Sequence, residues 1–406
     1  MLNKYKIKGI KKLKEVVLIK QGEMFLKGLN KKNFETILIK NIKEKLKDLK
    51  NLKFLKEQST ITIFPESQKD LNIVLKKIPF VFGIACFMKA LILEKDFEKI
   101  KLSAKTYLKD TLKNCKTFKV YAKRADKKFC LSSLQICQKL GEFLLGEFNH
   151  LKVCLKNPEV VVYVEIRDNY SYLYCNKQQG AKGMPVKSAG HAMLLLSGGI
   201  DSPVAGWMMA KRGLQLSAIH FVSPPYTSER ALEKVKSLTL KLEAFVGKIK
   251  LFVVNITAIE EHLKKNCKES FLTVVLRRIM IKMAQEIVFN ENEKLNLKIN
   301  SLITGESLAQ VASQTVEAIN CTNSCSKIPI FRPLIGMDKE EIVKIAKKID
   351  TFAISILPYE DCCTIFTPKH PKTNTTLFQL QEVEKNLNLE NLIKNPSFEV
   401  LSLNMS

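Results

Sequence analysis

The 406-residue sequence contains no long apolar run. Its longest apolar stretches, such as residues 78–88 and 193–196, are far shorter than the roughly 20 residues that a bilayer-spanning helix needs. The basic N-terminus is not followed by the apolar segment of about 7 to 15 residues that signal peptides contain. We therefore expect a cytoplasmic protein with no membrane partner.

Acidic residues are scarce in the N-terminal part of the chain. Residues 1–190 contain 18 Asp and Glu against 40 Lys and Arg, whereas residues 191–406 contain 22 against 26. Most of the net charge of +26 therefore lies in residues 1–190, which carry +22 (40 − 18). Since Lys and Arg that neutralise phosphates release condensed counterions, a polyanion is the natural partner of this part. A composition biased toward Lys and Asn is the alternative, but it does not explain the nearly neutral remainder.

The sequence also lacks a Cys-x-x-Cys pair, although it contains 11 cysteines. Cys321 and Cys325 have no second pair or His nearby, so we expect no structural zinc site. Most other cysteines lie in apolar surroundings and are expected to pack as small hydrophobic residues. Cys362 and Cys363 differ, because they lie in a polar segment flanked by prolines.

Periodicity predicts two small α+β units in the basic part. Residues 1–65 read as strand, helix and strand, with the helix at 33–49. Residues 66–178 alternate similarly and include an amphipathic helix at 132–145 and a hairpin near its end. Residues 179–190 contain three glycines and a proline without periodicity, which indicates a linker.

Residues 191–406 alternate between strand and helix patterns. The predicted strands are at 193–196, 216–222, 249–255 and 300–304, and the predicted helices are at 202–212, 229–246 and 257–289. This order predicts a parallel sheet with helices on both faces, so the fold class is α/β, of the doubly wound kind. Such sheets bind ligands at the carboxyl ends of their strands.

The segment Ser197-Gly-Gly-Ile-Asp-Ser202 follows the first of these strands. It lacks the lysine of a Walker loop, but it offers two hydroxyls, two glycines that let the backbone approach an anion, and a helix N-terminus. Asp201 would repel a phosphate unless a cation lies between them, so it indicates Mg²⁺. The segment therefore suits the pyrophosphate part of ATP, with an ordinary turn between strand and helix as the alternative.

Lys339 stands at an unusual place for a cation. Asp338 and Glu341 form a helix-capping pattern, which puts Lys339 at the N-terminus of the helix. The helix dipole disfavours a cation there unless an anion is bound. Lys339 therefore indicates that an anion is bound at this helix N-terminus.

The segment around Ser197 resembles the PP-loop of the ATP pyrophosphatase superfamily, and several further segments narrow the resemblance. In order along the chain they are KQGEMFLKGLNKKNFE (20–35), KVYAKRADKKF (119–129), LSGGIDSPVAGW (196–207), IHFVSPPYTSERA (219–231), GESLAQVASQT (305–315), RPLIGMDKEEI (332–342) and LPYEDCCTIFTPKHP (357–371). Each is similar to the corresponding segment of the tRNA 4-thiouridine and thiamine-biosynthesis sulfurtransferases. The resemblance implies a ferredoxin-like domain at 1–65, a THUMP RNA-binding domain at 66–178, and an ATP pyrophosphatase domain at 191–406.

The same resemblance implies the reaction. ATP adenylates O4 of the uridine at position eight of tRNA, and a protein-borne persulfide replaces that oxygen with sulfur. Sulfur is also passed in this family to the carrier protein that builds the thiazole of thiamine. The site residues that the motif and the resemblance imply for ATP are Leu195, Leu196, Ser197, Gly198, Gly199, Ser202, His220, Phe221, Arg277, Gly305 and Gln314.

The residues themselves support part of this assignment. His220 alone would more often be a core histidine than a ligand. Arg278 directly follows Arg277 in the sequence, so the choice between these two arginines for contact with the phosphates stays open. Gly305 ends an apolar strand, where a missing side chain leaves room for a nucleotide. Gln314 would otherwise be an ordinary helix residue, and it owes its role to the resemblance.

The resemblance also implies the catalytic residues Asp201, Lys339 and Cys362. A thiol that accepts persulfide sulfur reacts better when it is ionised and accessible, and the polar segment around Cys362 and Cys363 suits such a thiol. The alternative is that these are two loop cysteines without a role. For RNA binding we select the cationic residues of the basic turn, which are Lys119, Lys123, Arg124, Lys127 and Lys128.

The chain departs from longer members of the family. It ends about 35 residues after the last matching segment, so we expect no rhodanese domain and a separate cysteine desulfurase as persulfide donor. The alternatives are another PP-loop tRNA enzyme, of the 2-thiouridylase or lysidine synthetase type, and a non-catalytic RNA-binding relic. The sequence leaves the oligomeric state open, a homodimer included.

Overall fold

The computed structural model describes residues 14–23, 30–57, 59–362 and 375–403. The chain divides into two compact units, Met1–Gly183 and Met184–Ser406. Within the described residues, every helix is too short or too polar to cross a membrane.

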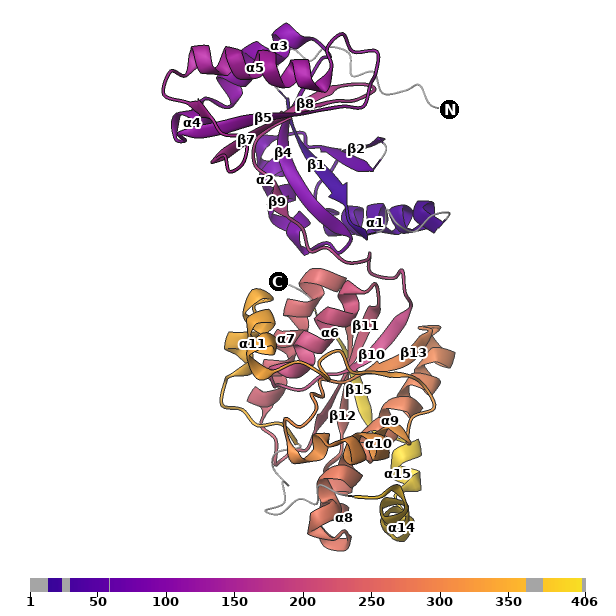
Figure 1. Cartoon of the computed structure of the whole chain (residues 1–406). Coiled ribbons are helices and arrows are strands. Elements are labelled where there is room, and N and C mark those ends of the chain that lie inside the picture. Colours follow the sequence, from indigo (N-terminus) through magenta and orange to yellow (C-terminus); the bar gives the residue numbers. More distant parts are fainter. Residues whose placement is uncertain (1–13, 24–29, 58, 363–374, 404–406) are drawn as a thin grey trace. The chain divides into compact units, whose positions relative to one another are not determined.

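The first unit is a mixed sheet with helices against it (Figure 1). Its elements are β1 (Lys14–Gln21), α1 (Lys31–Lys45), β2 (Lys53–Glu57), β3 (Thr60–Phe64), α2 (Gln68–Lys77), η3 (Ile78–Phe80), β4 (Ile84–Leu93), α3 (Phe97–Tyr107), α4 (Lys109–Lys113), β5 (Thr117–Arg124), α5 (Ser133–Glu147), β6 (Lys152–Val153), β7 (Val160–Ile166), β8 (Ser171–Tyr174) and β9 (Gln178–Gln179). The strand order is β2-β3-β1-β4-β8-β7-β5-β6, with β9 beside β4. Strands of the two predicted N-terminal domains therefore share one sheet, joined where β4 pairs with both β1 and β8.

Most of the predicted elements of this unit are confirmed. Ser132 caps α5 through a capping box with Gln135, and β7 and β8 form the predicted antiparallel hairpin. Ile136, Leu140 and Leu144 of α5 are fully buried in the core between this helix and the sheet, as their helical spacing predicts. The helix predicted at 33–49 ends earlier, at Lys45. Strands β2 and β4 and helices α2, α3 and α4 were not predicted.

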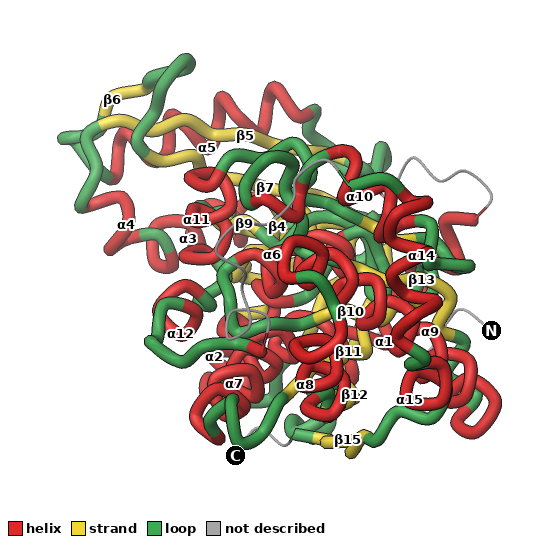
Figure 2. The backbone as a smooth tube through the Cα atoms, turned by 90° about the horizontal axis from the view of Figure 1, so that it is seen from below, coloured by secondary structure: helices red, strands yellow, loops and turns green. Residues whose placement is uncertain are grey.

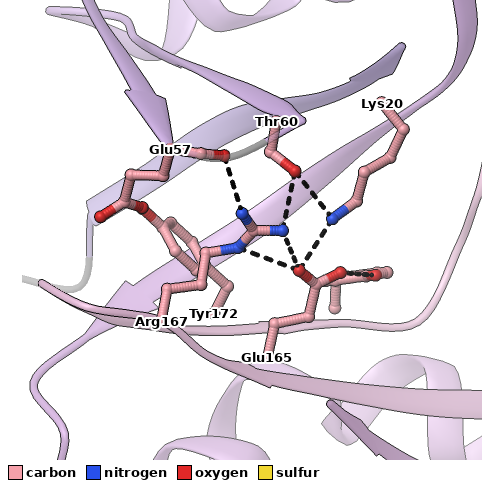
Figure 3. A network of polar contacts seen from close by, with 7 residues as sticks. Lys20, Glu57, Thr60, Glu165, Arg167 and Tyr172 are labelled. Atoms are coloured by element: carbon pink, nitrogen blue, oxygen red, sulfur yellow. Dashed lines mark hydrogen bonds and ion pairs between the residues drawn. The ribbon is translucent and has the colours of Figure 1, made fainter. Parts of the chain in front are cut away.

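A buried ionic cluster joins the two parts of this sheet (Figure 3). The Glu165 carboxylate of β7 accepts hydrogen bonds from Lys20 Nζ of β1 (2.8 Å), Arg167 Nε (3.0 Å) and Tyr174 Oη (2.7 Å). Arg167 and Lys20 both donate to Thr60 Oγ1 of β3, at 2.7 and 3.1 Å. Burial by itself would raise the pKa of Glu165, but the charges of Lys20 and Arg167 outweigh it and lower the pKa to about 2. The cluster ties β1 and β3 to β7 and β8.

The second unit is a sheet between two helical layers. Its elements are β10 (His191–Leu195), α6 (Asp201–Lys211), β11 (Gln215–Val222), α7 (Glu229–Val246), β12 (Lys250–Asn255), α8 (Thr257–Asn266), η4 (Glu269–Phe271), α9 (Leu272–Leu295), β13 (Ile299–Ile303), η5 (Ala312–Gln314), α10 (Val316–Asn323), β14 (Ile330–Phe331), α11 (Lys339–Lys348), α12 (Phe352–Ser355), α14 (Leu377–Leu387), α15 (Glu390–Lys394) and β15 (Phe398–Ser402). The strand order is β14-β13-β10-β11-β12-β15. All neighbouring strands are parallel except β15, which is antiparallel to β12.

Helices cover both faces of this sheet, which confirms the predicted α/β class. Helix α6 packs against α7 and α11, and residues of α8 and α9 share a core cluster with β10, β11 and β12. From below, strands β10, β11 and β12 lie between α7 and α9 (Figure 2). The doubly wound order puts the carboxyl end of β10 at the centre of one sheet edge.

One predicted helix of this unit is wrong in its extent. The segment 257–289 forms two helices, because the backbone of Cys267 and Lys268 is extended and ends α8. Neither residue is a Gly or a Pro, so the local sequence contains no breaker. Helix α9 then begins after the 3₁₀ turn η4.

Candidate functional site

The β10–α6 loop (residues 196–200) is held in its conformation by hydrogen bonds of two serine hydroxyl groups, one in the loop and one in the first turn of α6. Ser197 N donates to Ser202 Oγ (2.9 Å), the two hydroxyls are 3.0 Å apart, and Gly199 N donates to Ser197 Oγ (3.3 Å). The two serines expected at the nucleotide therefore hold the loop in shape. The loop lies at the carboxyl end of β10, as the motif predicts.

Asp201 and Lys339 are brought together by the fold. Lys339 Nζ donates to Asp201 Oδ1 at 2.6 Å, although the two residues are 138 positions apart. Gln310 Nε2 donates to the other carboxylate oxygen at 2.9 Å. The anion that Lys339 faces in this structure is thus the Asp201 carboxylate.

The capping box predicted before α11 is confirmed. Glu341 N donates to Asp338 Oδ1 (2.8 Å), and Asp338 N donates to Glu341 Oε2 (3.2 Å). Lys339 is the first residue of the helix, and its side chain is 47% exposed. The cap fixes where the helix begins and thereby directs Lys339 toward Asp201.

Gly305 lies directly against the first turn of α6. A Cβ at this position would be 2.8 Å from Ser202 N and 3.0 Å from the carbonyl carbon of Asp201. The space beside Gly305, which we expected to admit a nucleotide, is therefore filled by the backbone of α6. The missing side chain allows the end of β13 to approach the loop.

The structure separates the roles of Arg277 and Arg278. Arg278 is buried and forms a bidentate pair with Glu384 of α14, with Nε to Oε1 at 2.5 Å and Nη2 to Oε2 at 3.1 Å. Arg277 Nη1 instead donates to Glu306 Oε1 (3.1 Å) and to the Ser313 carbonyl (3.4 Å). Of the two, Arg277 faces the segment that contains Gly305 and Gln314.

Gln314 has an unused acceptor. It ends the 3₁₀ turn η5 and is 5% exposed. Among the described residues its Oε1 has no hydrogen-bond partner. A buried polar atom without a partner costs free energy, about 1 to 3 kcal/mol, so this oxygen is a candidate ligand contact.

Four more of the residues that the resemblance implies for ATP are buried or half-buried. The ring of His220 is 4% exposed, its Nδ1 donates to the Leu196 carbonyl (2.9 Å), and burial lowers its pKa. Leu196 N donates to the Ile219 carbonyl (2.8 Å), so both backbone groups of Leu196 already have protein partners. Phe221 belongs to the core cluster, and Leu195 is half-buried beside it.

Cys362 is not the accessible thiol that we expected. It is 2% exposed and belongs to the apolar core cluster that includes Phe221. The polar sequence around it predicted exposure, but the segment 357–361 packs against the β10–α6 loop and α7. Cys363 lies outside the described residues.

Two charged residues that the sequence analysis did not select connect this segment to the loop. Both oxygens of the Asp361 carboxylate accept from Gly198 N, at 3.0 and 2.9 Å. Lys234 of α7 is 6% exposed, and its Nζ donates to the carbonyls of Leu357 (2.9 Å) and Tyr359 (3.3 Å). Burial lowers the pKa of Lys234, and the charge of Asp361 partly opposes this.

Lys234 carries a signal in the sequence that could have found it. It lies at helical spacing from Ala231 and Leu238, both of which are buried. A lysine in the apolar stripe of a helix needs a partner for its charge.

The residues selected for RNA binding lie on β5 and in the turn that follows it. They are Lys119, Lys123, Arg124, Lys127 and Lys128, of which Lys123, Lys127 and Lys128 are exposed. Lys119 Nζ donates to the Leu155 carbonyl (3.1 Å), and the Arg124 guanidinium donates to the carbonyls of Phe129 (3.3 Å) and Leu131 (3.4 Å). Arg124 therefore holds the turn that presents the exposed lysines.

An exposed tyrosine accompanies these cations. Tyr121 is 52% exposed, and its ring contacts that of Tyr163 edge-on, with centroids 5.7 Å apart. Lys177 Nζ lies 3.8 Å from the centre of the Tyr163 ring. Strand alternation puts Tyr121 on the same face as Lys119 and Lys123. Since bases stack on aromatic rings, this sheet face combines positive charge with a stacking surface.

No group of three or more His, Cys, Asp or Glu side chains in the described part of the chain could hold a metal ion. Asp201 is the carboxylate at the end of the β10–α6 loop, and its partners are Lys339 and Gln310. A metal bound there would need ligands from a substrate as well as from the protein.

Three protein families match this chain in succession. Residues 16–87 match the ThiI ferredoxin-like domain, residues 94–176 match the THUMP domain, and residues 187–389 match the family described as thiamine biosynthesis protein (ThiI).

Similar proteins match over nearly the whole chain. A probable tRNA sulfurtransferase of Acetivibrio thermocellus is 46% identical over 384 residues, which cover 94% of this chain and 96% of the relative. One of Caldanaerobacter subterraneus is 43% identical over 391 residues, which cover 96% and 100%. The crystal structure of a 4-thiouridine synthetase–RNA complex with bound ATP is 35% identical, with a TM-score of 0.86, and the match covers 96% of this chain and all of that one.

Proposed function

The chain belongs to the ThiI family, and the relatives reported above are named probable tRNA sulfurtransferases. We propose that it uses ATP to replace O4 of a tRNA uridine with sulfur, forming 4-thiouridine. The observation that carries this proposal is the pairing of Lys339 with Asp201 at the carboxyl end of β10. The fold brings two candidate catalytic groups to the edge of the sheet where α/β enzymes bind ligands.

ATP binds at the β10–α6 loop. The unpartnered Oε1 of Gln314 supports the fit of a nucleotide, because it is an acceptor that an adenine amino group would satisfy. Arg277 supplies positive charge to the phosphates, and it exchanges part of its contact with Glu306 for them. Lys339 binds the phosphate charge that develops as pyrophosphate leaves.

Asp201 fits a magnesium ion. Mg²⁺ usually takes one or two carboxylates from a protein and completes its shell with phosphates and water. When bound, the ion neutralises phosphate charge and orients the pyrophosphate for departure. Asp201 supplies the carboxylate, and its bond to Lys339 holds it at the start of α6.

Sulfur enters through Cys362. The O4 of the uridine attacks the α-phosphorus of ATP, and pyrophosphate leaves. The terminal sulfur of a Cys362 persulfide then bonds to C4, and AMP leaves with the former O4. The uridine is then joined to Cys362 by an S–S bond. A second thiol attacks the sulfur of Cys362, which releases 4-thiouridine and leaves a disulfide between that thiol and Cys362. A thiol reductant restores both thiols. A separate cysteine desulfurase supplies the persulfide.

The first unit binds the tRNA. Exposed Lys123, Lys127 and Lys128 and the half-exposed ring of Tyr121 support contact with phosphates and an unpaired base. The target is the uridine at position eight. We further propose that the chain transfers sulfur to the carrier protein that builds the thiazole of thiamine. We also propose that it is located in the cytoplasm and assembles as a homodimer.

The proposal is tested by reconstitution. The chain is incubated with ATP, Mg²⁺, unmodified tRNA, a cysteine desulfurase, cysteine and a thiol reductant, and the product is followed by the absorbance of 4-thiouridine. We expect product that depends on ATP and on Cys362. Cys362→Ser abolishes sulfur transfer but retains pyrophosphate release, because adenylation does not use the thiol.

Cys325→Ser is the matched control, because Cys325 is a half-buried cysteine of the same unit with no proposed role. It should retain both activities. Absence of 4-thiouridine with a desulfurase that is active on its own would contradict the proposal. Product from Cys362→Ser would contradict the role of this thiol.

The alternatives are less well supported. The matches to the ferredoxin-like and THUMP domains occur in the order of this family, which 2-thiouridylases and lysidine synthetases lack. A non-catalytic relic does not account for the Lys339–Asp201 pair or for the bonds that maintain the β10–α6 loop.

A further inference from the structure

The β10–α6 loop holds a carboxylate where a nucleotide phosphate is expected. Gly198 N is a backbone donor of the loop, and both oxygens of Asp361 accept from it at 2.9 and 3.0 Å. A Cβ at Gly198 would lie 3.1 Å from Asp361 Oδ1, so the carboxylate is in close contact with the backbone of this glycine. Exposed backbone N–H groups beside a helix N-terminus bind anions, and a carboxylate is one.

A phosphate and the Asp361 carboxylate cannot share this donor. Two negative charges a few ångströms apart repel each other strongly in a partly buried site. Gly198 N has one hydrogen to donate. A phosphate that reaches the loop therefore displaces the carboxylate.

Lys234 makes the displacement favourable. Its side chain passes 3.2 Å from the Cβ position of Gly198, and it is buried. It now holds the segment 357–361 through the carbonyls of Leu357 and Tyr359 and through the charge of Asp361. Once the carboxylate leaves, this buried cation lies beside the phosphate, so α7 supplies the lysine that the loop itself lacks.

The residue after Asp361 is Cys362, which is 2% exposed in this conformation. A thiol buried in an apolar cluster cannot take sulfur from a second protein. Building on the proposed function, we infer that Asp361 and the phosphates of ATP compete for Gly198 N, so that nucleotide binding frees the segment 357–362 and exposes Cys362. Asp361 and Lys234 are thus positioning residues that make persulfide loading follow ATP binding.

The experiment measures thiol exposure in the full chain. A Cys363→Ser background is treated with a short pulse of iodoacetamide, and alkylation of Cys362 is quantified by peptide mass spectrometry. Cys130, which is exposed in the other unit, provides the internal reference. The probes are a non-hydrolysable ATP analogue and inorganic pyrophosphate, each with Mg²⁺, and calorimetry records their binding to the same samples.

We expect the alkylation of Cys362 relative to Cys130 to rise when either probe binds. A hydrogen bond to a charged acceptor stabilises the closed segment more than a neutral one, and the difference corresponds to a roughly tenfold change in the alkylation rate of Cys362. Asp361→Asn keeps the shape but removes the charge, so it should raise the ligand-free rate by about tenfold and reduce the response to the probes. Asp350→Asn, which removes an exposed carboxylate paired with Lys241, is the matched control and should behave as the parent.

A second variant keeps the test independent of Asp361. Lys234→Met removes the two bonds to the carbonyls of segment 357–361, and it should also raise the ligand-free alkylation of Cys362 while weakening pyrophosphate binding. Equal alkylation with and without a probe that calorimetry shows to be bound would overturn the inference. The same holds for an unchanged ligand-free rate in Asp361→Asn.

Failure of the inference is distinguishable from failure of the proposed function. If the chain forms 4-thiouridine while Cys362 is alkylated equally in both states, only the inference is wrong. If calorimetry detects no binding of the ATP analogue, the proposed function is wrong.

Discussion

Replacing Gly305 by alanine tests whether the contact between β13 and α6 sets the geometry of the site. The new Cβ would lie 2.8 Å from Ser202 N and 3.0 Å from the carbonyl carbon of Asp201. Both are backbone atoms, so neither can move away by changing a rotamer. Ordinary contact begins near 3.4 Å, and the first turn of α6 must therefore shift by 0.6 Å (3.4 − 2.8).

The cost of this shift has two parts. Overpacking of this kind destabilises a protein by about 1 to 3 kcal/mol, and each kcal/mol lowers the melting temperature of a unit of this size by about 2 to 4 °C. The shift also moves Asp201 relative to Lys339. Since a misplacement near 1 Å can cost about 100-fold in rate, we expect kcat/KM to fall by roughly tenfold to 100-fold.

The assays are 4-thiouridine formation and thermal unfolding monitored on the same samples. Gly146→Ala is the control, because Gly146 lies in α5 and a Cβ there meets no atom within 4 Å. It should keep full activity and gain about 0.5 to 1 kcal/mol from helix propensity. Wild-type turnover and an unchanged melting temperature in Gly305→Ala would refute the packing argument.

Further predictions concern charges. Asp201→Asn should abolish pyrophosphate release, while its tRNA affinity in a filter-binding assay stays as in the parent. Loss of both properties would point to misfolding instead. Arg278→Met removes the bidentate partner of Glu384 and leaves Lys282 Nζ (2.7 Å) as its remaining ionic partner, so it should cost about 1 to 3 kcal/mol in urea unfolding, whereas Arg277→Met should mainly raise the KM for ATP. The pKa of Glu165 is about 2 when folded against an ordinary 4.5, so its stabilisation is complete above pH 4.5 and is lost as the pH falls toward 2. Glu165→Gln should therefore be less stable than the parent at pH 7, and the gap should narrow on acidification; a constant gap measured by urea unfolding would refute this assignment.

Much of the fold follows from local patterns. Helix α7 occupies the predicted residues 229–246, and β10, β11, β12 and β13 lie within a residue or two of their predicted limits. Period and side-chain type determine these elements because each depends on neighbours in the chain. The division of 257–289 into α8 and α9 was not predictable, since the residues at the break are ordinary helix formers or neutral.

The site was predictable in its parts but not in its contacts. The motif identified Asp201, the capping pattern identified Lys339, and the resemblance identified Cys362. None of these shows that Lys339 reaches Asp201 across 138 residues. The choice of Arg277 over Arg278 also depends on Glu384, a residue of α14 that only the tertiary structure brings within hydrogen-bond distance of Arg278.

By itself, the sequence determined the charge of the first unit, the order of strands and helices, and the loop that marks the nucleotide site. These properties depend on composition and on spacing along the chain. Only the tertiary structure decided that Asp361 binds Gly198, that Lys234 holds the segment before Cys362, and that this cysteine is buried. The physical reason is that helical and strand periodicity tells which face a side chain occupies, whereas its partner depends on how distant elements pack against that face.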